Sequence, residues 1–341
     1  MKTATQILSS YLRARYSLLA VRSPEEERTI QDIMTVAEKS GREVYLWSIT
    51  RGLYPASKLA AVKVDSKDSK FNESSKDPVN GLFDSIFSAK DMKALFILLD
   101  FNPYLTDPRV ARRLREASLA LSRTTIREAK TIILLSADAK LPDSMPNEGA
   151  TIDWPLPDRE RLTMQLESFV GAVEEEKRPN ISGEGLNEII DASMGLTVQE
   201  SINVWSRCLV DQRTLEPKQI ASEKRQVISR TGLLQWVDSE FTMANVGGLE
   251  GLKDWMVARR PIFTQEARDY GIPAPKGVLL VGVPGGGKSL MAKVASNTLG
   301  LPLVRLDVGA LFGGLVGQSE ENTRAVLKTL SAIAPCICWI N

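Results

Sequence analysis

The glycine-rich stretch GVPGGGKS at residues 282–289 constrains this chain more than any other feature of the sequence. It fits the pattern G-x-x-x-x-G-K-[ST], follows the apolar run GVLLV at 277–281, and precedes a helix-forming stretch at 289–299. Glycines let the backbone curl until successive amides point at one anion, and the helix that follows directs the positive end of its dipole there. An ordinary glycine-rich turn needs no such strand and helix around it. The context therefore predicts a site for the phosphates of a nucleotide.

The polar groups of this loop have distinct expected tasks. We expect Lys288 to neutralise the β- and γ-phosphate oxygens and Ser289 to offer its hydroxyl to Mg²⁺. The predicted cofactors are ATP and Mg²⁺. The predicted phosphate site consists of Gly282, Val283, Pro284, Gly285, Gly286, Gly287, Lys288, Ser289 and Leu290.

The composition excludes several other classes of function. The chain of 341 residues has no histidine, which excludes a Ser-His-Asp triad and any zinc site that contains histidine. Lys and Arg number 43 against 42 Asp and Glu, so no whole-molecule charge draws the chain to nucleic acid or anionic lipid. Its start has no long apolar run, and no run approaches the roughly 20 residues that span a bilayer. We expect an intracellular protein with no membrane partner and no clear nucleic-acid signal.

Strands and helices alternate through the first 175 residues. Continuous apolar runs are typical of strands that are covered on both faces, and this alternation predicts a parallel, doubly wound sheet. The strands are expected at 18–21, 43–49, 94–99 and 131–135, and an Arg-rich helix is expected at 108–122.

Helical periodicity dominates after the proline-rich stretch 155–157, and strand–loop–helix order returns near residue 240. The helices are expected at 159–174, 185–192 and 197–209. The sequence therefore predicts three regions. They are an α/β domain at 1–175, a helical lid or linker at 176–238, and the first half of a second α/β module at 239–341.

The segments around the loop resemble those of AAA ATPases. FTMANVGGL at 241–249 is similar to the opening segment of that family, in which a V-G-G turn contacts adenine, so Val246 and Gly247 are expected at the base. GLVGQSE at 314–320 resembles the first pore loop and the turn behind it, and AIAPCICWI at 332–340 resembles the strand that leads into Walker B. These matches occur in the order of the family. The resemblance implies a P-loop module whose sheet has the strand order 5-1-4-3-2.

Two positions depart from the family pattern. The pore position that is usually aromatic is Leu315, which could still grip a threaded polypeptide or could pack on its neighbour. The Walker B aspartate position is Asn341, and an amide cannot supply the negative charge that holds Mg²⁺. The glutamate that activates water and the arginine finger have no counterpart in these residues. We therefore expect the second module to be cut short and the chain alone to be deficient in hydrolysis.

The first domain resembles the same family without a phosphate loop. Leu95 to Asp100 resembles a Walker B strand, and LPDRER at 156–161 resembles the segment that leads to the lid helices. After the first strand, however, the chain reads RSPEEER at 22–28, where Ser23 is expected to cap a helix whose first turn carries acids that repel phosphate. We expect a degenerate, nucleotide-free AAA-like domain; an unrelated α/β domain is the alternative. The fold class predicted for the whole chain is α/β, with two P-loop-NTPase-like parallel-sheet modules, the first degenerate and the second incomplete.

Segments outside the loop are also similar to the uncharacterised AAA family encoded in plastid and cyanobacterial genomes. They are YLRARYSLL near the start, EVYLWSITRGL at 43–53 and GLVGQSEENTR at 314–324. This family's substrate does not follow from the resemblance. The phosphate loop and the pore-like segment of the AAA resemblance imply an ATP-driven protein remodeller that forms a homo-oligomeric ring and acts on a protein client, in the cytoplasm or the plastid stroma. A nucleotide-gated binding or assembly module without efficient hydrolysis is the alternative function.

Overall fold

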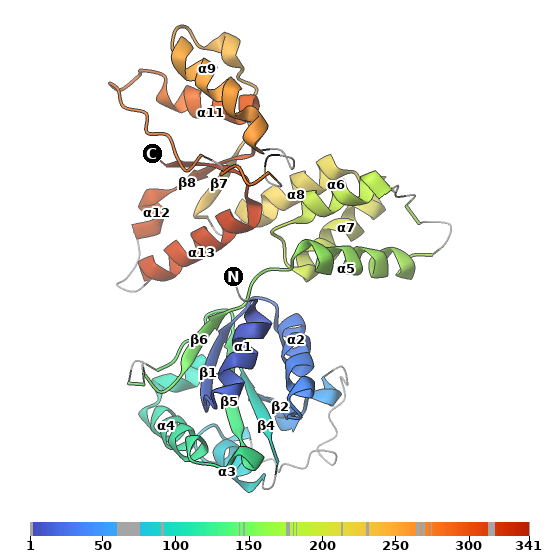
Figure 1. Ribbon diagram of the computed structural model, residues 1–341, viewed down its shortest axis with the longest axis vertical. Helices are drawn as coiled ribbons and strands as arrows, with labels where there is room; N and C mark the ends of the chain where they lie inside the picture. The colour runs from blue at the N-terminus through green and yellow to red at the C-terminus, as the bar shows by residue number, and fades with distance from the viewer. Residues whose placement is uncertain are drawn as a thin grey trace. The chain divides into compact units, whose positions relative to one another are not determined.

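The chain folds into two compact units, Met1–Pro155 and Leu156–Asn341 (Figure 1). The computed structural model describes residues 3–59, 76–89, 92–142, 144–145, 147–174, 178–179, 181, 183–212, 214–229, 232–263, 267, 270–273, 275–312 and 318–340. Within this part of the chain, no helix is both long enough and apolar enough to cross a membrane.

The first unit is built on a sheet with the order β3-β2-β4-β5-β1-β6. Only the β2–β3 pairing is antiparallel; the others are parallel. Numbered along the chain without β3, the parallel strands stand in the order 5-1-4-3-2, which is the order implied by the AAA resemblance. The strands are β1 (Leu18–Arg22), β2 (Glu43–Ser48), β3 (Gly52–Pro55), β4 (Ala94–Leu99), β5 (Lys130–Ser136) and β6 (Ala150–Asp153).

Helices cover both faces of this sheet, so the predicted doubly wound layers are confirmed (Figure 1). Neighbouring strand residues point to opposite faces: Leu19 belongs to the core beneath α1 and α2, and Leu18 belongs to the core beneath α3 and α4. The helices are α1 (Ala4–Arg13), α2 (Glu26–Lys39), α3 (Gly81–Ser88) and α4 (Pro108–Ser122), with 3-10 turns η1 (Ala56–Lys58), η3 (Asn102–Thr106) and η4 (Ile126–Glu128).

The second unit begins with a helical part. Its core contains Leu162 and Leu166 together with the fully buried Trp205, whose indole Nε1 donates to Ser193 Oγ at 2.9 Å. Because Leu162 and Leu166 lie on α5, that helix packs with the helices that follow it, although the expected boundary at residue 175 places it in the first region. The helices are α5 (Arg159–Ala172), α6 (Gly183–Ser193), α7 (Val198–Gln212) and α8 (Pro217–Ser229).

A three-stranded sheet of order β7-β8-β9 forms the rest of the second unit. Strand β7 (Leu234–Val237) is antiparallel to β8 (Leu303–Leu306), which is parallel to β9 (Ile337–Ile340). Strand β9 lies within the stretch predicted to lead into Walker B. The surrounding elements are η6 (Met243–Asn245), α9 (Glu250–Arg259), η7 (Arg260–Phe263), α11 (Lys288–Leu299), α12 (Val308–Phe312) and α13 (Gln318–Ile333).

The strand predicted at residues 277–281 does not form. The segment carries no strand pairing, and its side chains Leu279 and Val281 are 87% and 86% exposed. A strand needs a neighbour to pair its backbone groups. In the order 5-1-4-3-2, the neighbours of this first strand are the fourth and fifth, whereas β8 and β9 correspond to the second and third. Among the described residues, none forms a strand that pairs with this apolar run.

Candidate nucleotide-binding site

The loop between residue 282 and helix α11 requires glycine at particular positions. Gly285 and Gly287 have φ angles of +83° and +77°, a backbone region that side chains with a Cβ rarely adopt. At Gly286 an added Cβ would lie 3.1 Å from the carbonyl oxygen of Val283. The Gly286 amide donates to that same oxygen at 3.1 Å, which closes a tight turn. The three glycines before Lys288 thus have separate geometric reasons for being there.

Lys288 is held against the loop by two carbonyl groups. Its Nζ donates to the oxygens of Gly282 at 2.9 Å and Val283 at 2.7 Å. An ammonium group has three donors, and carbonyl partners do not neutralise its charge. The geometry therefore places the Lys288 ammonium within the curl of the loop. Two of its three N–H groups donate to the loop, and the third can donate to an anion.

The amino terminus of helix α11 adds to this positive field. The helix begins at Lys288 after the left-handed residue Gly287, and its first turn contains no acidic residue. Ser289 lies on that first turn and is exposed, so its hydroxyl is open to a ligand. Loop amides, the Lys288 ammonium and the helix dipole act in the same direction, which fits a triphosphate with its metal ion.

The V-G-G turn is placed next to the helix that carries this loop. Val246 and Gly247 follow η6, and Gly248 and Leu249 then take left-handed φ angles of +72° and +60° as the chain enters α9. Helix α9 packs against α11, as the upper part of Figure 1 shows. The segment expected to meet adenine and the loop expected to meet phosphate thus lie on adjoining elements.

Two further residues of α11 hold the segment that leads to this turn, and sequence reasoning missed both. Asn297 Nδ2 donates to the backbone oxygens of Ser239 and Phe241, and the Lys293 ammonium lies 5.3 Å from the centroid of the Phe241 ring. The available signal was Asn297 itself, because asparagine is a weak helix former and often marks a position that needs its side chain.

In the first unit, the position that corresponds to the phosphate loop is the link between β1 and α2, and an ion pair within the protein occupies it. Only Ser23, Pro24 and Glu25 join β1 to α2, and the Glu25 side chain is buried 2.6 Å from Arg28. Ser23 was expected to cap the helix, but α2 begins at Glu26, and the Ser23 hydroxyl instead accepts the Glu25 amide at 3.1 Å. The helix therefore starts later than expected, with Glu25 rather than Ser23 at its N-cap.

Negative charge also gathers at the start of α2. Glu26 and Glu27 lie in its first turn, as expected. The pKa of Glu26 is raised by burial, and further by the charges of Asp100 and Glu27. Three carboxyl groups therefore influence one another where a phosphate would have to sit.

Two positions that the sequence singled out lie outside the described residues. These are Leu315 with its surrounding pore-like segment 313–317, and Asn341 at the Walker B aspartate position.

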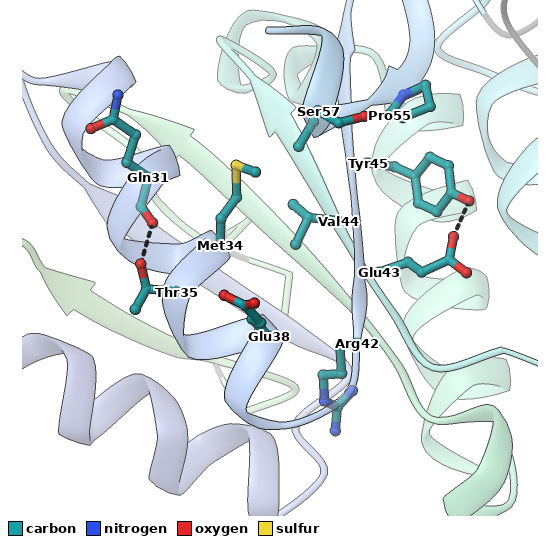
Figure 2. Close-up of a pocket in the computed structure, with 11 residues that line it drawn as sticks. Gln31, Met34, Thr35, Glu38, Arg42, Glu43, Val44, Tyr45, Pro55 and Ser57 are labelled. Carbon is teal, nitrogen blue, oxygen red and sulfur yellow. Dashed lines mark hydrogen bonds between the residues drawn. The ribbon is translucent and has the colours of Figure 1, made fainter.

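A hollow of about 600 Å³ lies on the first unit between α2 and the β2–β3 edge (Figure 2). The Tyr45 hydroxyl donates to Glu43 Oε2 at 2.6 Å there, and burial together with this bond raises the pKa of Tyr45. Glu43 begins β2, so the hollow lies at the amino end of that parallel strand, whereas ligands of open α/β sheets bind beyond the carboxyl ends. The lining residues are Gln31, Met34, Thr35, Glu38, Arg42, Glu43, Val44, Tyr45, Pro55, Ala56 and Ser57.

Comparison with protein families matches most of the chain. Residues 4–154 match the N-terminal domain of SpoVK-like AAA ATPases, residues 160–231 match the second domain of the same proteins, and residues 278–341 match the AAA ATPase family. The match over the first unit removes the alternative of an unrelated α/β domain.

Similar proteins are found in plastid-bearing algae. Each of three relatives is described as an uncharacterized AAA domain-containing protein ycf46. The one from Trieres chinensis is 31% identical over 97% of this chain and 63% of its own length. Those from Guillardia theta and Pyropia yezoensis are each 30% identical, over 97% and 99% of this chain and over 62% and 65% of their own lengths. The chain thus spans less than two thirds of these relatives. From the sheet order of its first unit, the loop before α11 and these matches, we conclude that the chain belongs to the AAA ATPases with SpoVK-like domains.

Proposed function

We propose that this chain binds ATP with Mg²⁺ at residues 282–290, with Val246 and Gly247 on the side of the base. The observation that carries the proposal is the loop geometry, in which Lys288 is held by the carbonyl groups of Gly282 and Val283 at the start of a helix without acids in its first turn. Bound Mg²⁺ would supply charge neutralisation at the phosphates, and Ser289 is the residue of this loop that would hold it.

We further propose that the protein works as an ATP-driven remodeller of a protein client, as a ring of identical subunits, in the cytoplasm or the plastid stroma. Family membership supports an ATPase activity in general. In this proposal the nucleotide lies between subunits, and Leu315 faces a central channel through which the client passes.

The first experiment measures binding of a fluorescent adenine nucleotide to the purified protein with Mg²⁺. The wild-type protein should show saturable binding, and Lys288→Ala should weaken it by at least about tenfold, because a charge-assisted contact to phosphate is lost. Lys276→Ala is the matched control, since it removes an exposed lysine from the segment before the loop. Absence of saturable binding in the wild-type protein would refute the proposal.

The second experiment measures phosphate release, on the protein with any residues that its reading frame encodes after Asn341. A remodeller should turn over ATP, and Lys288→Ala should abolish the turnover.

Asn341 favours a second candidate function, in which ATP binding changes assembly without rapid hydrolysis. An amide at the Walker B aspartate position cannot hold Mg²⁺ as a carboxylate does. Sedimentation with and without ATP separates the two candidates. A nucleotide-dependent change in sedimentation without phosphate release supports the assembly module, and identical sedimentation in both conditions counts against it.

A further inference from the structure

We propose that Asn297 is a positioning residue that holds the V-G-G turn in place for adenine, while contributing nothing to the binding of phosphate. The inference rests on the proposed function, because it assumes that the loop binds an adenine nucleotide. It adds a residue of α11 that lies outside the motif and outside every segment on which the AAA resemblance was based.

Both amide hydrogens of Asn297 are used to hold one distant segment. Its Nδ2 donates to the backbone oxygen of Ser239 at 2.8 Å and to that of Phe241 at 2.7 Å. These are short bonds between residues more than fifty positions apart, and an amide nitrogen has only two hydrogens to give. The side chain is thus committed fully to the chain that leads into the V-G-G turn.

A second contact lies on the same face of the helix. Lys293 precedes Asn297 by one helical turn, and its ammonium lies 5.3 Å from the centroid of the Phe241 ring. Phe241 is 41% exposed and Glu240 is exposed, so the segment is only partly covered. The contacts from Asn297 and Lys293 therefore contribute to fixing it.

The held segment connects two rigid points. Upstream, β7 is paired with β8, and Asp238 bonds Arg225 of α8 at 2.5 Å. Downstream, Thr242 and Asn245 form a reciprocal capping box, from which the chain passes directly to Val246 and Gly247. Since so few residues separate Phe241 from Val246, a shift of Phe241 moves the turn.

Asn297 is too far along the helix to act on phosphate. Asn297 lies nine positions after Lys288, which is roughly 13 Å along the axis of an α-helix. Its effect on a nucleotide must therefore pass through the segment 239–247 to the base, whereas the phosphates are held at the opposite end of α11.

The test compares two ligands on the purified protein with Mg²⁺. The ligands are ATP and inorganic tripolyphosphate, each measured by displacement of a fluorescent adenine nucleotide. Asn297→Asp keeps the size of the side chain but replaces both donors with acceptors that face carbonyl oxygens. It should weaken ATP binding by about tenfold, as expected for losing two hydrogen bonds, and leave tripolyphosphate binding within about twofold.

Asn297→Ala is the second variant, because it removes the donors without adding charge, and it should change ATP binding in the same direction. Thr298→Ala is the matched control: it removes only a bond within the helix, from Thr298 Oγ1 to the Val294 oxygen, and should affect neither ligand. Amide hydrogen exchange should become faster at residues 241–248 in both Asn297 variants and remain unchanged in the control.

The outcomes separate this inference from the function on which it rests. If the wild-type protein binds no ATP, both are overturned together. If the wild-type protein binds ATP and both Asn297 variants bind it equally well, the inference alone is overturned. It is also overturned if ATP and tripolyphosphate weaken equally, because the residue then stabilises α11 as a whole rather than the turn.

Discussion

Lys224 is a buried cation whose replacement should stabilise the second unit. It lies on α8 with 8% of its surface exposed, and its pKa is lowered from 10.5 to about 8. Burial is the main cause of this shift; Cys336 and Asp191 act in the opposite direction but do not compensate for it. A change of this size corresponds to about 3 kcal/mol of free energy against the charged form.

The change we would make is Lys224→Met, which keeps an unbranched apolar stem and removes the charge. At pH 7 the wild-type lysine is protonated in both the folded and the unfolded state, so the full penalty is present. The lowered pKa of Lys224 already includes the attraction to Asp191, so we expect the free energy of unfolding of the variant to exceed that of the wild-type protein by about 3 kcal/mol.

The pH dependence gives the sharper test. Between pH 8 and 10.5 the folded state binds fewer protons at Lys224 than the unfolded state, so the wild-type protein gains stability as the pH rises. The advantage of the variant should therefore shrink over this window. The pKa of Cys336 is raised to about 11, mainly by burial, which lowers stability above pH 9 in both proteins. Because Lys224 lowers the pKa of Cys336, the loss should be larger in the variant, which shrinks its advantage further as the pH rises.

The assay is urea unfolding at pH 7, 8, 9 and 10, followed by tryptophan fluorescence and circular dichroism. Lys276→Met serves as the control, because it removes an exposed lysine of the same unit and should give a small difference that does not vary with pH. A variant that is less stable than the wild-type protein at pH 7, or a difference that stays constant up to pH 10, would refute the reasoning.

Two further predictions concern the loop and its counterpart in the first unit. Gly287→Ala should lower the free energy of unfolding of the second unit by about 1 kcal/mol, because Gly287 has a φ of +77°. Gly282→Ala is the control and should change this free energy little, because an added Cβ there meets nothing within 4 Å. Equal effects of the two variants in urea unfolding would contradict this. Glu25→Gln should destabilise the first unit by about 2 kcal/mol, because it removes the carboxylate 2.6 Å from the buried Arg28 and leaves Asp32, 3.6 Å away, as an acidic partner. Asp153→Asn removes an exposed partner 3.4 Å from Arg22 and should have little effect. Thermal unfolding of the two variants side by side checks the difference.

The elements that were predicted well from the sequence are those whose cause lies in their own residues. The apolar runs at 94–99 and 131–135 became β4 and β5, whose residues are all buried, because both faces of the sheet are covered. Helix α4 spans the predicted residues because Asp107 accepts the Arg109 amide at 2.8 Å and Pro108 opens the first turn.

Other elements depend on partners that a local pattern does not reveal. Strands β3, β6 and β7 have four residues each, too few for a periodic signal, and they exist because a neighbouring strand pairs with them. The run at 277–281 shows the converse, since it has a strong apolar pattern but pairs with no strand in the described part of the chain. The asparagine at 297 within a helical stretch signals a position that needs its side chain, but its partners lie more than fifty residues away, so the sequence does not reveal which residues it contacts.

The two units differ at the turn that precedes the first helix after their first strand position. In the first unit, cores on both faces hold the 5-1-4-3-2 order, while the turn after β1 is occupied by the buried Glu25–Arg28 pair. The sheet is thus stable without a phosphate loop. In the second unit, the turn before α11 keeps left-handed glycines that add nothing to a hydrophobic core.

The charges at the amino termini of α2 and α11 differ in sign. Helix α2 begins with Glu26 and Glu27, which satisfy the positive end of its dipole from within the protein. Helix α11 begins with Lys288 and has no acid in its first turn, so the dipole and the ammonium reinforce each other. A protein that gained nothing from an anion there would be more stable with the arrangement found at α2. Among the described residues no acid lies in the first turn of α11, whereas α2 carries two there, and this contrast supports the proposal that the second unit is the one that binds a nucleotide.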